Sequence, residues 1–279
     1  MSLTWNAAEP PEVRAPRAWE RGMMILRGLA LVLLTYFGMI FVLLFNLIER
    51  ALPLGISHRI ICLWGRICLR LCGLRLVRQG TPMQGGGAIV ANHASWIDIF
   101  TLLAADQVYF VSKADVARWP VVGVLSRQIG TVYIERKRTE AKQQEAQLRA
   151  RLEAGDKLCF FPEGTSTDGQ RVLDFRSTLF AAFMAEGLRD TLSVQPVSVI
   201  YHPPEGLPPA FYGWWGAMGL GSHLSAVFAL SRGGIVEVVH HAPLAASDYP
   251  DRKALAAACE AAVRCGVETA LLRGGPPAV

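Results

Sequence analysis

The sequence predicts an α/β fold with a mostly parallel central sheet flanked by helices, preceded by an N-terminal membrane-associated helical pair. After residue 77, short apolar runs typical of strands alternate with segments typical of helices. Residues 28–48 carry no charge and, as a helix, would extend about 31 Å, the thickness of a bilayer core. We therefore divide the chain into a flexible tail (1–18), membrane-associated helices (19–76) and an α/β domain (77–279).

The three N-terminal segments differ in composition. Residues 1–18 are rich in Pro, Glu and Arg without apolar periodicity, which indicates a flexible tail. A cleaved signal peptide is disfavoured for residues 28–48, because the apolar run is long and no small-residue cleavage site follows. Residues 56–76 have an arginine face, which predicts an amphipathic helix at the membrane; a core helix is the alternative. Arginines flank the apolar run on both sides, so its orientation, spanning or re-entrant, stays open.

The overall composition favours contact with a membrane. Of the 279 residues, 52% are hydrophobic and only 18% are charged, with a mean hydropathy of +0.29. The net charge of +5 suits an anionic lipid surface. No basic stripe interleaved with aromatic residues is present, so nucleic acid is not expected as a partner. The six cysteines lack zinc spacing, which indicates no metal site and reduced thiols in the cytoplasm.

The strands and helices of the α/β domain can be placed approximately. We expect strands near residues 74–78, 88–91, 108–112, 131–134, 158–161, 194–200 and 235–240. Residues 139–154, stopped by Gly155, form the clearest helix, and an alanine-rich helix is expected over 255–272. Trp214 and Trp215 lie in a loop expected to touch the membrane interface or pack on the sheet. Four histidines without a motif are expected at the surface or at strand ends: His202, His223, His240 and His241.

The strand over residues 88–91 delivers a histidine, His93, followed five residues later by Asp98. A carboxylate can fix the tautomer of an imidazole and stabilise its protonated form, so that the free ring nitrogen takes a proton from a hydroxyl. We expect Ser95 to cap the next helix, whose first N–H groups would stabilise an oxyanion. The alternative is a structural histidine and an ordinary helix aspartate.

Two motifs occur in order: Asn92-His93 with Asp98, and Phe161-Pro162-Glu163-Gly164-Thr165. Together they resemble the glycerolipid acyltransferases of the 1-acylglycerol-3-phosphate type, over about residues 77–199. The resemblance implies that residues 77–279 form an acyltransferase domain. It would move a fatty acyl group from acyl carrier protein or coenzyme A to the free hydroxyl of a lysolipid. The resemblance implies no bound cofactor; the partners would be the thioester, the lysolipid and membrane lipids.

The resemblance also implies roles for single residues. His93 would be the catalytic base and Asp98 its partner. Glu163 would lie near the acceptor's glycerol hydroxyl, and the residues after it near its phosphate. Arg136, in the block 130–136, corresponds to a phosphate-binding arginine, although its physical context also fits a solvated basic run. The substrate-binding candidates are Asn92, Lys113, Arg136, Glu163, Gly164 and Thr165.

One position departs from the family's pattern. Many members have an arginine directly after Glu-Gly-Thr, where this chain has Ser166. Arg171 or Arg176 would have to substitute, or the head group is not a simple phosphate. Residues 163–177 look closer to the lyso-ornithine-lipid acyltransferase branch, whose acceptor is a zwitterionic amino-acid lipid. Lysophosphatidate and lyso-ornithine lipid both remain open as acceptors.

Two other functions compete with acyl transfer. A serine hydrolase is disfavoured because the chain has no Gly-x-Ser-x-Gly motif. A non-catalytic, membrane-anchored lipid-binding protein of the same fold is the second alternative, against which the intact histidine and carboxylates argue. We expect the protein in a membrane, in bacteria the inner membrane, with its catalytic domain on the cytoplasmic side.

Overall fold

A computed structural model describes residues 4–11, 14–49, 52, 55–119, 122–134, 141–185 and 187–277 of the chain. These residues form an eight-stranded sheet in the order β1-β7-β6-β2-β5-β3-β4, with β8 paired to β6. The strands are β1 Leu74–Gln79, β2 Gly87–Ala91, β3 Tyr109–Lys113, β4 Val132–Ile134, β5 Lys157–Phe160, β6 Ser193–His202, β7 Gly234–His240 and β8 Leu244–Ala245. The α-helices are α1 Ala18–Glu49, α2 Ile56–Leu71, α3 Asp98–Ala105, α4 Val122–Gln128, α5 Ala141–Glu153, α6 Leu220–Phe228 and α7 Arg252–Leu272. Short 3-10 helices are η1 Ala114–Arg118, η3 Ser177–Met184 and η4 Ala246–Asp248.

The sheet is mostly parallel, which confirms the predicted fold class. Strands β6, β2, β5, β3 and β4 run in one direction. Strand β7 is antiparallel to β6, and β1 is parallel to β7, so β7 and β1 run in the opposite direction. The carboxyl ends of β2, β5 and β3 therefore meet at one edge of the sheet. Open α/β sheets bind their ligands at this edge.

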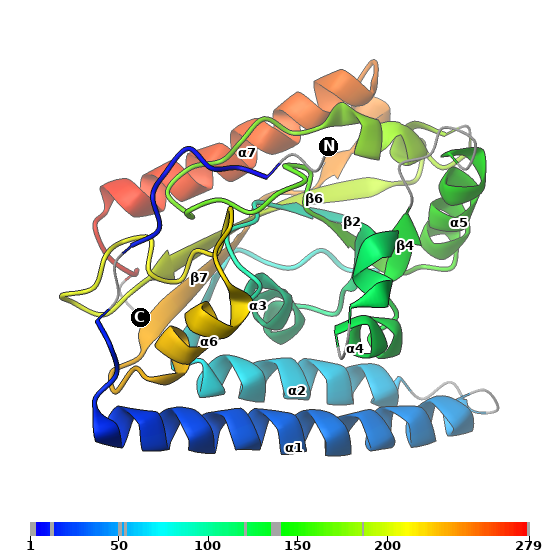
Figure 1. Cartoon of the computed structure of the whole chain (residues 1–279). Coiled ribbons are helices and arrows are strands. Elements are labelled where there is room, and N and C mark those ends of the chain that lie inside the picture. Colours follow the sequence, from blue (N-terminus) through cyan, green and yellow to red (C-terminus); the bar gives the residue numbers. More distant parts are fainter. Residues whose placement is uncertain are drawn as a thin grey trace.

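Helices cover both faces of the sheet (Figure 1). Along β2 the side chains alternate: Ile89 and Ala91 pack into the core shared with α2 and α3, while Ala88 and Val90 pack toward α5 and α7. All five residues of β2 are buried, which explains why its sequence is a continuous apolar run.

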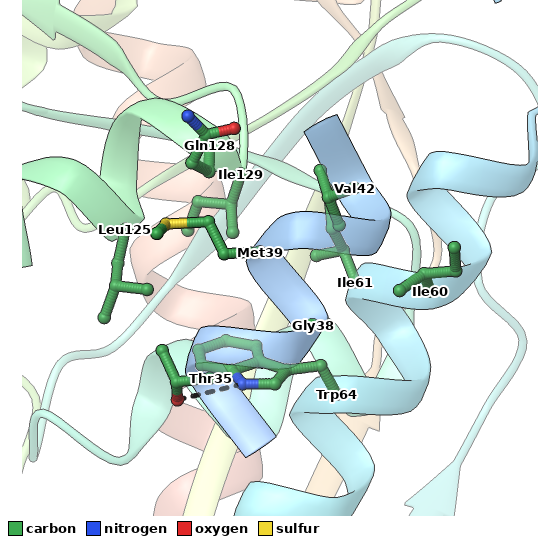
Figure 2. Close-up of a pocket in the computed structure, with 10 residues that line it drawn as sticks. All are labelled: Thr35, Gly38, Met39, Val42, Ile60, Ile61, Trp64, Leu125, Gln128 and Ile129. Carbon is green, nitrogen blue, oxygen red and sulfur yellow. Dashed lines mark hydrogen bonds between the residues drawn. The ribbon is translucent and has the colours of Figure 1, made fainter. Parts of the chain in front are cut away.

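Helix α1 lies side by side with α2 below the sheet (Figure 1). It is the one helix among the described residues long and apolar enough to cross a membrane. Thr35 of α1 accepts a hydrogen bond from the Trp64 indole of α2 at 3.2 Å (Figure 2). The two helices and α4 enclose a small apolar cavity of about 30 Å³ there. One side of α1 is therefore fixed to the protein.

Three expectations about these segments need correction. The amphipathic helix ends at Leu71 and not at residue 76, because Gly73, at φ 71°, turns the chain into β1. Helix α3 starts at Asp98, and Ser95 does not cap it. Residues 4–11 of the expected flexible tail instead contact the loops that follow β5 and β6.

Candidate active site

The carboxyl end of β2 places an imidazole beside a buried carboxylate. The Nδ1 atom of His93 lies 2.7 Å from Oδ2 of Asp98. The Asp98 side chain is fully buried, whereas 23% of the His93 side chain is exposed. With Nδ1 held by the carboxylate, Nε2 is the ring nitrogen that can accept a proton from a substrate.

Asp98 is itself held by three further donors. Its Oδ2 accepts hydrogen bonds from the N–H groups of Ala94 and Ser95 at 2.8 and 3.0 Å. Its Oδ1 accepts one from the Tyr201 hydroxyl at 2.6 Å. The carboxylate therefore has one fixed orientation toward the imidazole. The N–H groups of Ala94 and Ser95 are thereby occupied by Asp98, whereas an oxyanion-binding role for the first N–H groups of α3 stays a prediction.

An aromatic ring fixes the plane of the His93 imidazole. The ring of Phe161, directly after β5, stacks on it with centroids 4.2 Å apart and planes 20° apart. Phe110 of β3 stacks behind Phe161 at 6.1 Å. The imidazole is thus oriented through its Nδ1 atom and through its face, which restricts Nε2 to one direction.

The buried side chain of Glu163, in the second motif, connects that loop to the loop of His93. Its side chain is buried, with Oε1 accepting from the N–H of His93 at 2.7 Å and Oε2 from the N–H of Leu173 at 2.8 Å. Burial raises the pKa of Glu163 to about 8, although both N–H donors act in the opposite direction. Glu163 therefore positions the His93 backbone, and the expectation that it faces the acceptor's hydroxyl needs correction.

Asn92 also has a structural position. It is 1% exposed, and its amide donates to the carbonyl of Val199 at 2.9 Å and accepts from the N–H of Val199 at 2.8 Å. Both polar atoms of the side chain are thus used within the sheet. The expectation that Asn92 binds substrate needs correction for this reason.

Two cationic side chains converge on Gly164. Lys113, at the end of β3, donates to the Gly164 carbonyl at 3.3 Å. The Arg176 guanidinium lies against the Cα of the same glycine, where an added Cβ would come within 3.0 Å of its central carbon. Gly164 has a φ of 71°, so a side chain there would be strained as well as crowded. This pair can hold an anionic head group at the edge where His93 stands.

Of the two arginines considered as substitutes, only Arg176 is placed at Gly164. Arg171 instead forms an ion pair with Asp168, with Nη2 and Oδ2 2.9 Å apart. Ser166 is buried. Thr165 is half-buried, and its hydroxyl accepts a hydrogen bond from the Trp5 N–H at 3.4 Å. Arg136 lies outside the described residues, so its role stays a prediction.

The remaining histidines differ from expectation in one respect. His223 of α6 is buried, where its Nδ1 accepts from the Trp96 indole at 2.8 Å and its Nε2 bonds to the Phe211 carbonyl. Burial lowers the pKa of His223. The neutral ring thus supports the loop between β2 and α3. It also lines a cavity of about 720 Å³ between α6 and the N-terminal residues. His240 is also buried, but it lies at the end of β7, a strand end as expected.

Sequence reasoning missed two residues of this site, Tyr201 and Phe161. Tyr201 lies 103 positions after Asp98, and nothing in its strand distinguishes it from other buried residues. Phe161 belongs to the second motif, but its spacing from His93 does not indicate stacking. Both contacts arise from the pairing of β2 with β5 and β6.

The sheet, the His93–Asp98 pair and the motif order define an enzyme class, and the comparisons agree with it. A family model described as Acyltransferase matches residues 73–200. The chain is 50% identical to lyso-ornithine lipid O-acyltransferase of Rhodobacter capsulatus, over 94% of this chain and 96% of that protein. The chain belongs to the acyltransferase family, and it is an O-acyltransferase. The resemblance noted in the sequence is thereby confirmed.

Two further proteins are similar to this chain. Lyso-ornithine lipid O-acyltransferase of Brucella abortus is 37% identical, over 78% of this chain and 85% of that protein. The crystal structure of the 1-acyl-sn-glycerophosphate acyltransferase PlsC of Thermotoga maritima superimposes with a TM-score of 0.64 at 21% identity. That match covers 91% of this chain and 100% of the other, and it establishes a shared fold.

Proposed function

We propose that this enzyme transfers a fatty acyl group from an acyl thioester to the free hydroxyl of lyso-ornithine lipid. The observation that carries the proposal is the partly exposed His93 imidazole, fixed by the buried Asp98 next to two cations at Gly164. A pair of this kind removes a proton from a hydroxyl, and the cations bind the anionic group of a lipid.

The reaction follows from this geometry. Nε2 of His93 takes the proton of the acceptor hydroxyl as its oxygen attacks the thioester carbonyl carbon. The buried carboxylate of Asp98 stabilises the imidazolium that forms. The tetrahedral intermediate then expels the thiolate, which takes the proton from the imidazolium. An ester and a free thiol result, and the chemistry requires no bound cofactor; the thioester is on acyl carrier protein or coenzyme A.

The number of cationic side chains near Gly164 favours lyso-ornithine lipid as the acceptor. An ornithine head group carries one carboxylate and one ammonium, whereas the phosphate of lysophosphatidate carries more negative charge. The chain has Ser166 where many family members have a further arginine, and Arg171 is already paired with Asp168. Lys113 and Arg176 both lie at Gly164, and two cations suit a head group with one carboxylate.

Lysophosphatidate is the second candidate acceptor. The favouring observation is that Lys113 and Arg176 together also fit a phosphate, because a guanidinium and an ammonium both bind phosphate oxygens. The two acceptors therefore have to be compared in one experiment.

We further propose that α1 lies along the membrane surface of the cytoplasmic leaflet. One side of α1 is bound to the protein at both ends of its packed stretch, through Arg27 to the carbonyls of Phe228 and Leu230 and through Glu49 to Ser57. The other side exposes large apolar residues: Ile25, Leu26, Leu29, Val32, Leu33, Tyr36, Phe37, Ile40, Phe41, Leu44, Leu47 and Ile48. This arrangement suits an interfacial helix. Free thiols at all six cysteines fit the cytoplasm.

The test is acyl transfer by the purified full-length protein in mixed micelles. Lyso-ornithine lipid and lysophosphatidate are offered separately, each with acyl carrier protein and with coenzyme A thioesters. We expect a higher kcat/KM for lyso-ornithine lipid and loss of turnover in His93→Ala. A higher kcat/KM for lysophosphatidate would establish the second candidate. Turnover of neither acceptor, or full activity of His93→Ala, would refute the proposed reaction.

A further inference from the structure

Residues 4–11, which we call the N-terminal strap, cross the loops around the candidate active site. In Figure 1 the dark blue N-terminal segment lies away from α1 and passes across loops of the α/β domain. Ala8 accepts a hydrogen bond from the Trp215 indole at 3.0 Å. The Asn6 side chain lies against Gly216. The strap is thus attached to the loop between β6 and α6, some two hundred positions away in sequence.

Trp5 connects the strap to the second motif loop. Its main-chain N–H donates to the hydroxyl of Thr165 at 3.4 Å. Its indole has Arg171 over one face, with the guanidinium carbon 5.2 Å from the ring, and the ring of Trp215 edge-on at 6.0 Å. Arg171 is held in turn by Asp168. A guanidinium over an indole is an attractive contact, so Trp5 fixes the part of the loop that follows Gly164.

The loop that carries Trp215 is also bound to the catalytic histidine's loop. The N–H of Trp214 donates to the Ala94 carbonyl at 2.8 Å. The N–H of Thr167 donates to the His93 carbonyl at 2.9 Å. Trp5 therefore contacts two loops, each of which hydrogen-bonds to the segment that carries the base. A displacement of Trp5 would be felt at Thr165 first, because that contact is direct.

We propose that Trp5 is a positioning residue for the acceptor's head group, and this inference rests on the proposed acyl transfer. The main-chain N–H of Trp5 occupies one acceptor site of the Thr165 oxygen, and the indole keeps it there through its contacts with Arg171 and Trp215. The hydroxyl itself donates to the Ser166 carbonyl at 3.4 Å, a contact as long as the one it accepts from Trp5. A hydroxyl held in this way is able to turn its hydrogen toward an anion bound at Gly164. Trp5 thus acts through Thr165 and Arg171 and does not take part in the proton transfer.

The experiment compares steady-state kinetics of Trp5→Ala, Trp5→Phe and a control, with the full-length protein in mixed micelles of lyso-ornithine lipid. The control is Glu9→Ala, an exposed position of the same strap. Loss of a stacking contact at a partly exposed site corresponds to a factor of about five to ten. We expect Trp5→Ala to raise the acceptor's KM by about that factor, with kcat and the donor's KM unchanged. Trp5→Phe should recover most of the loss, and Glu9→Ala should match the parent protein.

A second variant tests whether the strap acts as a unit. Trp215→Phe keeps an aromatic ring but removes the indole N–H that donates to Ala8, and we expect a smaller rise in the acceptor's KM. Combining it with Trp5→Ala should add little, because both changes release the same segment. An unchanged KM in Trp5→Ala, or a fall in kcat alone, would overturn the inference.

Failure of the proposed function has a different signature. If the parent protein acylates neither acceptor, no KM can be measured. Amide hydrogen exchange then still tests whether Trp5 fixes the loop after Gly164. We expect residues 164–171 to exchange faster in Trp5→Ala than in Glu9→Ala. Equal exchange in the two variants would show that Trp5 does not fix this loop.

Discussion

Tyr201 and Asp98 meet inside the protein, with the phenol hydroxyl donating to the carboxylate at 2.6 Å on the side away from His93. Each is buried, and they come from different elements, β6 and α3. The phenol therefore holds the carboxylate that holds the base.

Tyr201→Phe should lower kcat about tenfold and leave both KM values unchanged. A hydrogen bond to a charged group contributes about 1.5–3 kcal/mol, part of which orients Asp98. Tyr212→Phe is the matched control, because Tyr212 is a neighbouring buried phenol whose hydroxyl accepts from Gly234 instead. Steady-state kinetics of the two variants give the comparison. Equal losses in both would mean that packing, and not the contact with Asp98, is responsible.

His93→Ala should reduce kcat by about two to four orders of magnitude, the usual contribution of a general base. Asp98→Asn should lose a comparable factor, because a neutral amide cannot stabilise the imidazolium. Its oxygen can still accept from the imidazole and the two N–H groups, so we expect it to fold. Circular dichroism and single-turnover rates measure both. Normal turnover in folded Asp98→Asn would make Asp98 a purely structural residue.

Glu163 should make the stability of the protein depend on pH in an unusual direction. Its pKa is raised from 4.5 to about 8 by burial, so between these values the folded state keeps a proton that the unfolded chain has lost. The stability contributed by Glu163 is therefore full below about pH 4.5 and is lost as the pH rises to about 8. Glu163→Gln has no such proton. Denaturant midpoints measured across this window should fall for the parent relative to the variant, and parallel profiles would contradict the assignment.

Arg176→Ala should raise the acceptor's KM by about tenfold or more, because a charge-assisted contact to the head group is lost. Arg176→Lys should recover part of this loss. If the head group binds elsewhere, Arg176→Ala will change neither the KM nor the preference between acceptors.

Ser166→Arg should separate the two acceptors. An added guanidinium restores the cation common in the family, so the KM for lysophosphatidate should fall. The same cation should repel the ammonium of lyso-ornithine lipid and raise its KM. Steady-state kinetics with both acceptors decide the matter, and a shift of both KM values in one direction would speak against a head-group site at Gly164.

The exposed face of α1 should carry membrane binding. Leu33→Glu with Phe37→Glu places two charges on that face, and each side chain also loses about 1–2 kcal/mol of burial in hydrocarbon. Sedimentation with anionic vesicles should show at least about a tenfold loss of binding. Leu272→Glu is the control, because α7 lies on the opposite face of the sheet (Figure 1). Equal binding of both proteins would place the membrane contact elsewhere.

Much of the fold could be predicted from local pattern. The run 88–91 is apolar at every position because helices cover both faces of β2, and this is typical of a parallel strand. The antiparallel direction of β7 was not predictable, because periodicity carries no information on strand direction. The end of α2 was placed too late because leucines lie on both sides of Gly73, and the apolar pattern alone does not show that this glycine ends the helix.

Only those parts of the site that lie within the two sequence motifs could be predicted. His93 and Asp98 lie close in sequence, so their contact follows from local structure. The roles expected of Glu163 and Asn92 did not follow, because a motif does not show which way a polar side chain points. Tyr201, Phe161 and Trp5 join the site through contacts that span between 68 and 160 positions. Such contacts depend on the whole topology.

The amide of Asn92 has a consequence for how rigid the base is. The backbone pairing of β2 with β6 ends at Ala91 and Val197, yet Asn92 occupies both hydrogen-bonding groups of Val199 with one side chain. The side chain thus extends the ladder by one step while the main chain is already free to turn. The main chain at His93 can therefore turn away from the sheet, although the preceding residue is still hydrogen-bonded to β6. An aspartate at position 92 would face the Val199 carbonyl with an oxygen, and the histidine would lose that anchorage.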